Sequence, residues 1–307
     1  MSAEFERIAV LGIGLIGSSI CHAVKKFGVA KDIVGHAKSA ETRKIALELG
    51  LVSKVFESPA DAVKGADLVI LCAPVGACGA IAAAIGSAIE PGAIVTDVGS
   101  VKGAIMRDCA PHIPKHAQFI PGHPIAGTEQ SGPRSGFADL FQNRWCILTP
   151  LPGSDEAAVQ KLDDFWQRLG SKVDRMSVEH HDLVLAMTSH LPHLIAYNSV
   201  ATAADLEEVT QSEVIKFSAG GFRDLTRIAA SDPTMWRDVF LNNREAVLEM
   251  LGRFMEELSM LQRAIRWGDG ETLFNLFTRA REIRKGIIAA GQDTAAPDFG
   301  RDPSHKG

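Results

Sequence analysis

The chain has 307 residues, of which 46% are hydrophobic and 22% charged, so it is long enough for two globular domains of ordinary composition. Its net charge of −5 provides no basic surface for nucleic acid or an anionic membrane, and no apolar run approaches the ~20 residues of a membrane-spanning helix. The five cysteines form no C-x-x-C pair and the N-terminus carries no apolar signal segment, so we expect a cytoplasmic protein with reduced thiols.

The first half of the chain alternates between strand and helix patterns. Buried strands are predicted at residues 7–12, 33–35, 67–73 and 93–98, and helices at 15–27, 39–50 and 79–89. Further strands at 118–121, 146–149 and 172–176, with a helix at 155–169, extend the alternation. Strands that are apolar on both faces belong to parallel sheets covered by helices. The pattern therefore predicts a doubly wound α/β domain over residues 6–178.

Beyond about residue 178 the pattern becomes helical. Long helices are predicted at 179–203, 233–267 and 271–290, with a break at Gly220-Gly221. Apolar residues keep a helical spacing from Met235 to Leu261, a stripe that fits packing against another helix or a second subunit. We expect a helical domain over residues 179–291, followed by a disordered, Asp/Pro/Gly-rich tail at 292–307.

A glycine loop, Gly12-Ile-Gly-Leu-Ile-Gly17, lies between the first predicted strand and helix. In this position Gly12 permits the tight turn, Gly14 lets the backbone approach a pyrophosphate, and Gly17 allows close helix–strand packing. The alternative is a turn in which the glycines serve packing alone. The strand–loop–helix context favours a Rossmann-type domain that binds NAD or NADP. The residues expected at the cofactor are Gly12, Gly14, Leu15, Ile16, Gly17, Ala37, Lys38, Ala73, Pro74 and Ser100.

The acidic residue that often binds the adenosine ribose of NAD is missing from this chain. It is expected about 20 residues after the glycine loop, where the sequence has Ala37 between His36 and Lys38. Without an acid nothing repels a 2′-phosphate, and Lys38 or Arg43 could pair with one. This favours NADP or the use of both nucleotides, although Lys38 also fits a solvated loop charge.

Two motifs place polar side chains near the carboxyl ends of the predicted strands. Asp97-Val-Gly-Ser-Val-Lys102 follows a strand at the edge where open α/β sheets bind ligands, so Ser100 faces a nicotinamide or substrate, or else caps a helix. Gly122-His-Pro-Ile-Ala-Gly-Thr-Glu129 holds His123 on a rigid segment, as a general base requires; a structural histidine is the alternative.

Two further motifs lie in the helical half. In Ser189-His-Leu-Pro-His193 the pair His190 and His193 has no third ligand at a metal-binding spacing, so we expect no metal site but a substrate-facing histidine beside a core histidine. Arg223 and Arg227 are four residues apart on one helical face, which suits carboxylate binding or, alternatively, surface pairing with Asp224 or Asp232.

Together these motifs resemble the prephenate/arogenate (cyclohexadienyl) dehydrogenases of tyrosine biosynthesis, from about Arg7 to Ala290. The glycine loop is common to many dehydrogenases, whereas the other four motifs in this order are specific. The resemblance implies a Rossmann domain, a helical dimerisation domain and a homodimer. It also implies oxidative decarboxylation of prephenate or arogenate, with hydride transfer to NAD(P)+, giving 4-hydroxyphenylpyruvate or tyrosine.

The resemblance also implies roles for individual residues. His123 would be the general base for the ring 4-hydroxyl, for which a pKa near neutrality is suitable; Ser100 would hydrogen-bond the same hydroxyl, and His193 would contact the substrate side chain or order the site. Arg227 would bind a substrate carboxylate. Secondary or pocket-lining positions are Arg223, Thr128, Glu129, Asp224 and Trp236.

Some features depart from the family pattern, and other functions remain open at this point. Ala37 leaves the choice of nucleotide undecided, and we expect neither a preceding chorismate mutase module nor a following ACT domain. One alternative is a dehydrogenase of the β-hydroxyacid dehydrogenase or imine reductase type, which would rely on a catalytic lysine or another polar set and not on His123. Another is a non-catalytic NAD(P)-binding regulator, which would need no base beside a carboxylate-binding arginine.

Overall fold

The computed structural model describes residues 4–128, 130–210, 216 and 218–289. Glu129 and the expected disordered tail at 292–307 lie outside the described residues. The chain divides into two compact units, Met1–Leu248 and Glu249–Gly307. The domain boundary at residue 178 stays a prediction.

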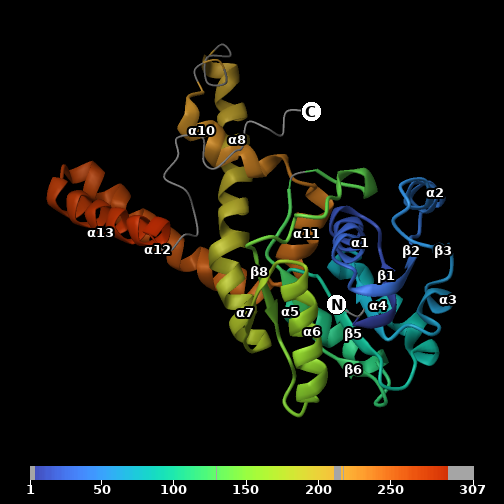
Figure 1. Cartoon of the computed structure of the whole chain (residues 1–307). Coiled ribbons are helices and arrows are strands. Elements are labelled where there is room, and N and C mark those ends of the chain that lie inside the picture. The colour runs from blue at the N-terminus through green and yellow to red at the C-terminus, as the bar shows by residue number, and fades with distance from the viewer. Residues whose placement is uncertain (1–3, 129, 211–215, 217, 290–307) are drawn as a thin grey trace. The chain divides into compact units, whose positions relative to one another are not determined.

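Six parallel strands form the main sheet of the first unit, in the order β3-β2-β1-β4-β5-β6 (Figure 1). They are β1 (Phe5–Leu11), β2 (Ala30–His36), β3 (Lys54–Phe56), β4 (Leu68–Leu71), β5 (Ile94–Asp97) and β6 (Gln118–Phe119). This order, with a crossover from β3 back to β4, is that of dinucleotide-binding domains. The predicted Rossmann-type sheet followed by a helical part is confirmed.

Helices connect these strands and make up the rest of the chain. The helices are α1 (Leu15–Phe27), α2 (Ala40–Glu48), α3 (Pro59–Val63), α4 (Val75–Ile85), α5 (Lys102–Cys109), α6 (Glu156–Arg168), α7 (Val178–Leu185), α8 (Leu191–Thr210), α10 (Gly220–Thr226), α11 (Pro233–Asn242), α12 (Arg244–Trp267) and α13 (Gly270–Ala289). Short 3-10 turns lie at Gly86–Ala88, Ala110–His112, Pro133–Ser135 and Arg227–Ala230.

The hydrophobic core lies on both faces of the main sheet, because alternate residues of a strand point to opposite faces. In β1, Ile8 and Val10 pack with residues of α1 and α6, whereas Ala9 and Leu11 pack with residues of α4 and α5. All four side chains are fully buried. The central strands are continuous apolar runs because helices cover both faces of the sheet.

A second, three-stranded sheet carries the motif with His123. It consists of β7 (Gly122–Pro124), β8 (Trp145–Leu148) and β9 (Lys172–Arg175), in that order. His123 pairs with Ile147 of β8 in an antiparallel register. The sequence predicted a rigid loop here; the segment is a short strand, and its rigidity comes from pairing with a strand more than 20 residues further along the chain.

The structure changes the bounds of three predicted helices, has helix α10 beginning at Gly220 where a break was predicted, and adds the unpredicted helices α3 and α5. The helix predicted at 79–89 begins at Val75, because Pro74 suits a helix start. The helix predicted at 233–267 is divided at Asn243, whose backbone leaves the helical region. The helix predicted at 179–203 contains a π-helical turn at Ala186–His190 and continues to Thr210 (Figure 1).

The π-helical turn has a cause in the sequence that follows it. Pro192 has no N–H, and its ring crowds the carbonyl group four residues earlier, at Thr188. An extra residue in the turn relieves this conflict, and such turns occur often at functional sites. The turn carries His190 and leads directly to His193.

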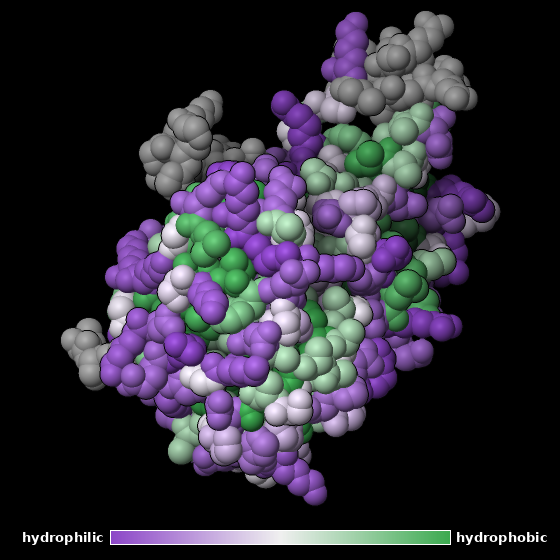
Figure 2. Space-filling model, turned by 90° about the vertical axis from the view of Figure 1, so that its right-hand side faces the viewer, coloured by the Kyte–Doolittle hydropathy of each residue, from purple (hydrophilic) through white to green (hydrophobic). Residues whose placement is uncertain are grey.

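The surface shows a mixed character. On the face in Figure 2, hydrophilic side chains surround smaller hydrophobic groups, as on most globular proteins. Within the described residues, none of the helices combines the length and the apolar character needed to cross a bilayer.

Candidate active site

The glycine loop forms a cradle that fits a dinucleotide. Gly12 has a φ of +109°, and a Cβ atom there would lie 2.6 Å from the carbonyl oxygen of Cys72 at the end of β4. A Cβ on Gly17 would collide with the carbonyl oxygen of Gly12, whereas the space around Gly14 is open. Gly14 caps α1 without a side chain, and the first turn is uncharged, so its N–H groups can bind a pyrophosphate.

The other residues predicted at the cofactor lie along the same edge of the sheet. Leu15 and Ile16 form the first turn of α1 and are partly buried, and Ala73 and Pro74 follow β4 beside the glycine loop. Ser100 is half-buried in the loop between β5 and α5.

At the end of β2, the structure separates the roles predicted for Lys38 and Arg43. Ala37 is buried and Lys38 is exposed. The Arg43 guanidinium donates to the carbonyl oxygens of Ala37 and Lys38, both at 2.9 Å, and lies 3.5 Å from Glu57. Arg43 therefore supports the loop. Of the two cations, Lys38 is the one that is suited to a 2′-phosphate.

An ion pair buried at 0% exposure joins the loop carrying Ser100 to the strand carrying His123. The Lys102 ammonium donates to Asp97 Oδ2 at 2.5 Å and to the carbonyl oxygen of Gly122 at 2.6 Å. Asp97 also accepts the N–H groups of Gly99 at 2.7 Å and Gly122 at 3.2 Å. The charged groups thus lie between the two segments that carry the predicted catalytic residues.

A chain of hydrogen bonds fixes the tautomer of His123. Asp182 accepts the backbone N–H groups of Lys102 and Gly103, at 2.8 and 2.7 Å, and lies 2.8 Å from His181 Nδ1. A carboxylate only accepts, so His181 Nδ1 carries the proton and its Nε2 is an acceptor. His123 Nδ1 lies 2.9 Å from that Nε2 and therefore donates to it. The lone pair of neutral His123 is left on Nε2.

The histidines of the site are kept neutral by their surroundings. Burial lowers the pKa of His123 well below its ordinary value, and electrostatic interactions with His181, Lys102 and His190 lower it further. Burial also lowers the pKa of His181, although the hydrogen bond that His181 donates to Asp182 opposes this shift. The predicted near-neutral pKa of His123 thus needs correction, because burial and the nearby Lys102 cation disfavour the imidazolium form.

Asp182 remains a carboxylate in this network. Burial raises its pKa, but the hydrogen bonds from His181, Lys102 and Gly103 outweigh burial and hold the pKa below its ordinary value. The network therefore consists of an anion and two neutral imidazoles, in agreement with the tautomers assigned from the hydrogen bonds.

His190 connects this network to the helical part of the site. Asn243 donates to the backbone oxygen of Asp182 at 2.8 Å and lies 3.1 Å from His190 Nδ1, so His190 carries its proton on Nε2. Burial lowers the pKa of His190 to about 4. Within the described part of the chain, His190 Nε2 and Trp236 Nε1 are buried donors without a hydrogen-bond acceptor. Such orphaned donors are typical of sites that a polar ligand completes.

His193 contacts Trp236, and Arg227 lies near enough to His193 for its charge to act on it; the substrate roles of these residues stay predictions. The His193 ring stacks on Trp236 with ring centroids 3.6 Å apart, and its Nδ1 donates to the carbonyl oxygen of Ser189 at 2.9 Å. Burial lowers the pKa of His193, the hydrogen bond to Ser189 opposes this, and the nearby Arg227 charge lowers the pKa further. Arg227 itself is exposed at the end of α10.

The remaining predicted residues lie at the edge of this arrangement or outside it. Arg223 is exposed and Asp224 half-buried on α10. Thr128 is exposed, and its hydroxyl accepts the N–H of Gln130 at 3.2 Å. Glu129 lies outside the described residues, so its role stays a prediction.

The sequence reasoning did not identify His181, Asp182 and Asn243. One available signal was the run His180-His181-Asp182 at a helix start, three titratable residues in succession. Asp97 and Lys102 were within a recognised motif but had no role assigned to them. Among the described residues, no group of three or more His, Cys, Asp or Glu side chains is arranged to hold a metal ion.

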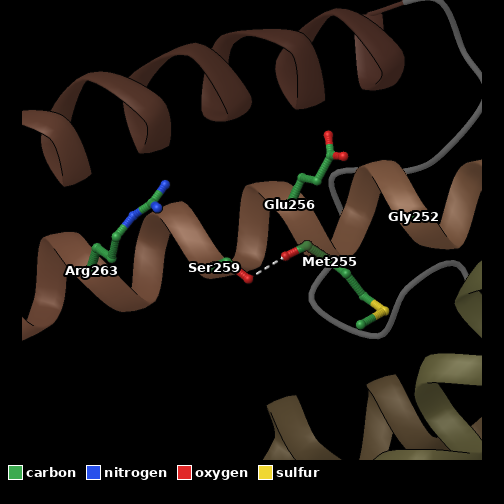
Figure 3. A pocket seen from close by; sticks show the side chains of 5 residues that line it. All are labelled: Gly252, Met255, Glu256, Ser259 and Arg263. Carbon is green, nitrogen blue, oxygen red and sulfur yellow. Dashed lines mark hydrogen bonds between the residues drawn. The ribbon is translucent and has the colours of Figure 1, made fainter.

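A surface depression on α12 contributes nothing to this site. It is lined by Gly252, Met255, Glu256, Ser259 and Arg263, which follow one another along a single helix (Figure 3). The hydrogen bond drawn there, from Ser259 Oγ to the carbonyl oxygen of Met255, is internal to that helix.

Comparison with known proteins agrees with the geometry. Residues 20–175 match the family described as prephenate dehydrogenase, nucleotide-binding domain, and residues 177–279 match prephenate dehydrogenase, dimerization domain. The chain is 41% identical to a cyclohexadienyl dehydrogenase of Zymomonas mobilis, over 92% of this chain and 96% of that protein.

Two solved structures are similar over most of the chain. The prephenate dehydrogenase of A. aeolicus, in complex with hydroxyphenyl propionate and NAD+, has a TM-score of 0.85 and 33% identity, covering 92% of this chain and 98% of that one. The arogenate dehydrogenase of Synechocystis has a TM-score of 0.77 and 27% identity, covering 92% and 100%. By its sequence and its fold, this chain belongs to the prephenate dehydrogenase family.

Proposed function

We propose that the protein catalyses the oxidative decarboxylation of prephenate, arogenate or both, in tyrosine biosynthesis. The observation that carries this proposal is the preset tautomer of His123, which leaves a base at Nε2. This base lies on the segment joined to the Ser100 loop at the carboxyl edge of the Rossmann sheet.

A bound NAD(P)+ supplies the hydride acceptor. His123 Nε2 accepts the proton of the ring 4-hydroxyl, which allows the carbon that bears it to release hydride. Ser100 hydrogen-bonds the same hydroxyl and aligns it with the imidazole. The bond to the ring carboxylate breaks and CO2 leaves. The electron pair of that bond moves through the ring to the oxygen of the former 4-hydroxyl, which takes the proton back from His123, and the ring becomes aromatic. His181 and Asp182 keep the His123 lone pair directed at the substrate throughout, which is the positioning a general base needs.

The substrate carboxylates are assigned to the helical side of the site. Arg227 offers the planar, bidentate donor that suits a carboxylate. His193 contacts the substrate side chain from its place on Trp236. The unpartnered N–H groups of His190 and Trp236 supply further donors. Arg223, Asp224, Thr128 and Glu129 complete the rim of the pocket in this proposal.

We also propose that both nucleotides serve as cofactors. The loop after β2 has no acid to repel a 2′-phosphate, and exposed Lys38 can pair with one. The ordinary Rossmann preference for NAD depends on that acid. The cradle formed by the glycine loop binds the pyrophosphate, which NAD and NADP share.

A two-by-two assay tests substrate and cofactor together, with prephenate or arogenate against NAD+ or NADP+. We expect turnover with at least one substrate and kcat/KM values for the two nucleotides within about tenfold, which corresponds to ~1.4 kcal/mol. The variant Ala37→Asp introduces the missing acid and should selectively lower kcat/KM for NADP+. If Ala37→Asp had the same kcat/KM for NADP+ as the wild type, the role assigned to this loop would be refuted.

The C-terminal helices are proposed to form a homodimer. Large apolar side chains project from α12 and α13, among them Trp267 at 79% and Phe274 at 70% exposure. Exposed apolar residues of this size and number mark protein interfaces, and this region overlaps the match to a dimerization domain.

The reduced cysteines and the small-molecule substrate are consistent with a cytoplasmic enzyme.

Light scattering of the purified protein tests the dimer. The mass should be twice the 32.9 kDa of one chain. Trp267→Arg combined with Phe274→Arg places charges on the apolar surface and should shift the mass towards that of one chain. A monomeric wild type at micromolar concentration would rule out a stable dimer.

A further inference from the structure

Besides contacting each other, Asp97 and Lys102 both bind backbone groups of neighbouring segments. Lys102 donates to the carbonyl oxygen of Gly122 and Asp97 accepts the N–H of the same residue, at 2.6 and 3.2 Å. Both backbone groups of the residue before His123 are therefore held by the pair. Asp97 also accepts the N–H of Gly99, the residue before Ser100, at 2.7 Å.

Two glycines make this close contact possible. A Cβ on Gly99 would lie 2.9 Å from Asp97 Oδ2, and a Cβ on Gly122 would lie 3.2 Å from the backbone oxygen of Asp97. A side chain at Gly99 would displace the Asp97 carboxylate, and a side chain at Gly122 would crowd the backbone of Asp97. The sequence thus has glycine at both positions that directly precede a proposed catalytic residue, and each glycine allows its segment to lie close to Asp97.

We propose, on the basis of the function proposed above, that the buried Asp97–Lys102 pair is a positioning element which holds Ser100 and His123 in reactive alignment. Neither residue touches the substrate in this role. Taking two charges out of water is costly, and neutral residues of similar size often stabilise a fold as well or better. The pair is therefore explained by what it aligns, since a misplacement of about 1 Å can lower a rate by ~10²-fold.

The pair also acts on His123 through its two opposite charges. The titratable and charged groups around His123 and its partner His181 are Asp182 from α7, Lys102 from α5, Asp97 from β5, His190 from the π-helical turn and the Cys146 thiol from β8. The Lys102 cation lowers the pKa of His123. The Lys102 and Asp97 charges shift the pKa of His181 in opposite directions. Loss of the cation should therefore raise the pKa of His123. Loss of the anion leaves the Lys102 charge uncompensated, so it should lower the pKa of His123.

The decisive protein is the double variant Asp97→Asn with Lys102→Met, because it leaves no unpaired buried charge. It should fold with a Tm near that of the wild type. Its kcat should be about 100-fold lower, while KM for substrate and nucleotide changes little, because the alignment acts on the transition state. A folded double variant with the wild-type kcat would overturn the proposal.

The single variants test the pH dependence of kcat/KM, which would not change if the pair served only the stability of the fold. His123 must be neutral to accept a proton, so kcat/KM falls as the pH drops through its pKa. Lys102→Met should move this acid limb to higher pH, and Asp97→Asn should move it to lower pH. Shifts in the same direction, or none, in folded single variants would contradict the proposal. If a single variant fails to fold, the double variant decides alone.

A matched control and a substrate-free measurement separate this inference from the proposed function. Lys26→Met with Asp139→Asn makes the same exchange in an exposed pair, with atoms 2.6 Å apart and side chains 48% and 57% exposed, and should leave kcat unchanged. A wild type without turnover would refute the proposed function. An active wild type whose double variant is equally active would refute only the inference. NMR titration of His123 in the single variants should show the opposite pKa shifts without any substrate.

Discussion

The variant His123→Asn is expected to lose about 10²–10⁴-fold in kcat while KM for substrate and nucleotide stays close to the wild-type value. Asparagine keeps a polar side chain on β7 but offers no nitrogen that can take a proton. The loss falls on kcat because the base acts in the transition state. Steady-state kinetics at saturating nucleotide measure this split directly.

A matched control uses a histidine outside the site. His112, exposed on the 3-10 turn Ala110–His112, can be changed to asparagine with no expected effect on kcat. A His123→Asn protein with the kcat of the wild type would remove His123 from the role of general base and with it the proposed mechanism.

The variant Arg227→Ala is expected to raise KM for the substrate by about 10- to 100-fold, with a smaller effect on kcat. Hydrogen bonds to charged groups contribute roughly 1.5–3 kcal/mol, and each 1.4 kcal/mol is a factor of ten. In the proposed role the guanidinium binds a carboxylate that is present in both the ground state and the transition state, so the loss should appear mainly in KM.

Exposed Arg144, in the segment before β8, provides the matched arginine-to-alanine control and should leave KM unchanged. Measurement of KM for the nucleotide in Arg227→Ala adds a second check, because a carboxylate-binding residue should not affect it strongly. An unchanged KM for the substrate in Arg227→Ala would contradict the assignment of this arginine.

The sequence predicted those parts of the site whose signal is local. The spacing of the glycine loop and the apolar strand before it predict the cofactor cradle, since a turn and a helix N-terminus need only neighbouring residues. His123 became a candidate because glycine and proline flank it, and its predicted role as a base came from the resemblance to the family. The alternation of strands and helices predicted the α/β fold for the same reason.

The rest of the site depends on contacts between distant residues. Asp182 accepts the N–H of Lys102, a residue 80 positions earlier, and His181 contacts His123 across 58 positions. Nothing in the local pattern at His181 indicates which histidine it supports. Similarly, the helical periodicity continues through Asn243, and only the structure shows that this residue ends α11 and bonds to Asp182 and His190.

The most direct test of the central claim is the stoichiometry of the reaction of the purified protein. Incubation with prephenate or arogenate and an oxidised nicotinamide nucleotide should yield reduced nucleotide, CO2 and an aromatic product in equal amounts. Hydride transfer and decarboxylation belong to one reaction at His123, so neither product should form without the other. Absence of turnover with both substrates and both nucleotides, or reduction of the nucleotide without release of CO2, would contradict the proposed function.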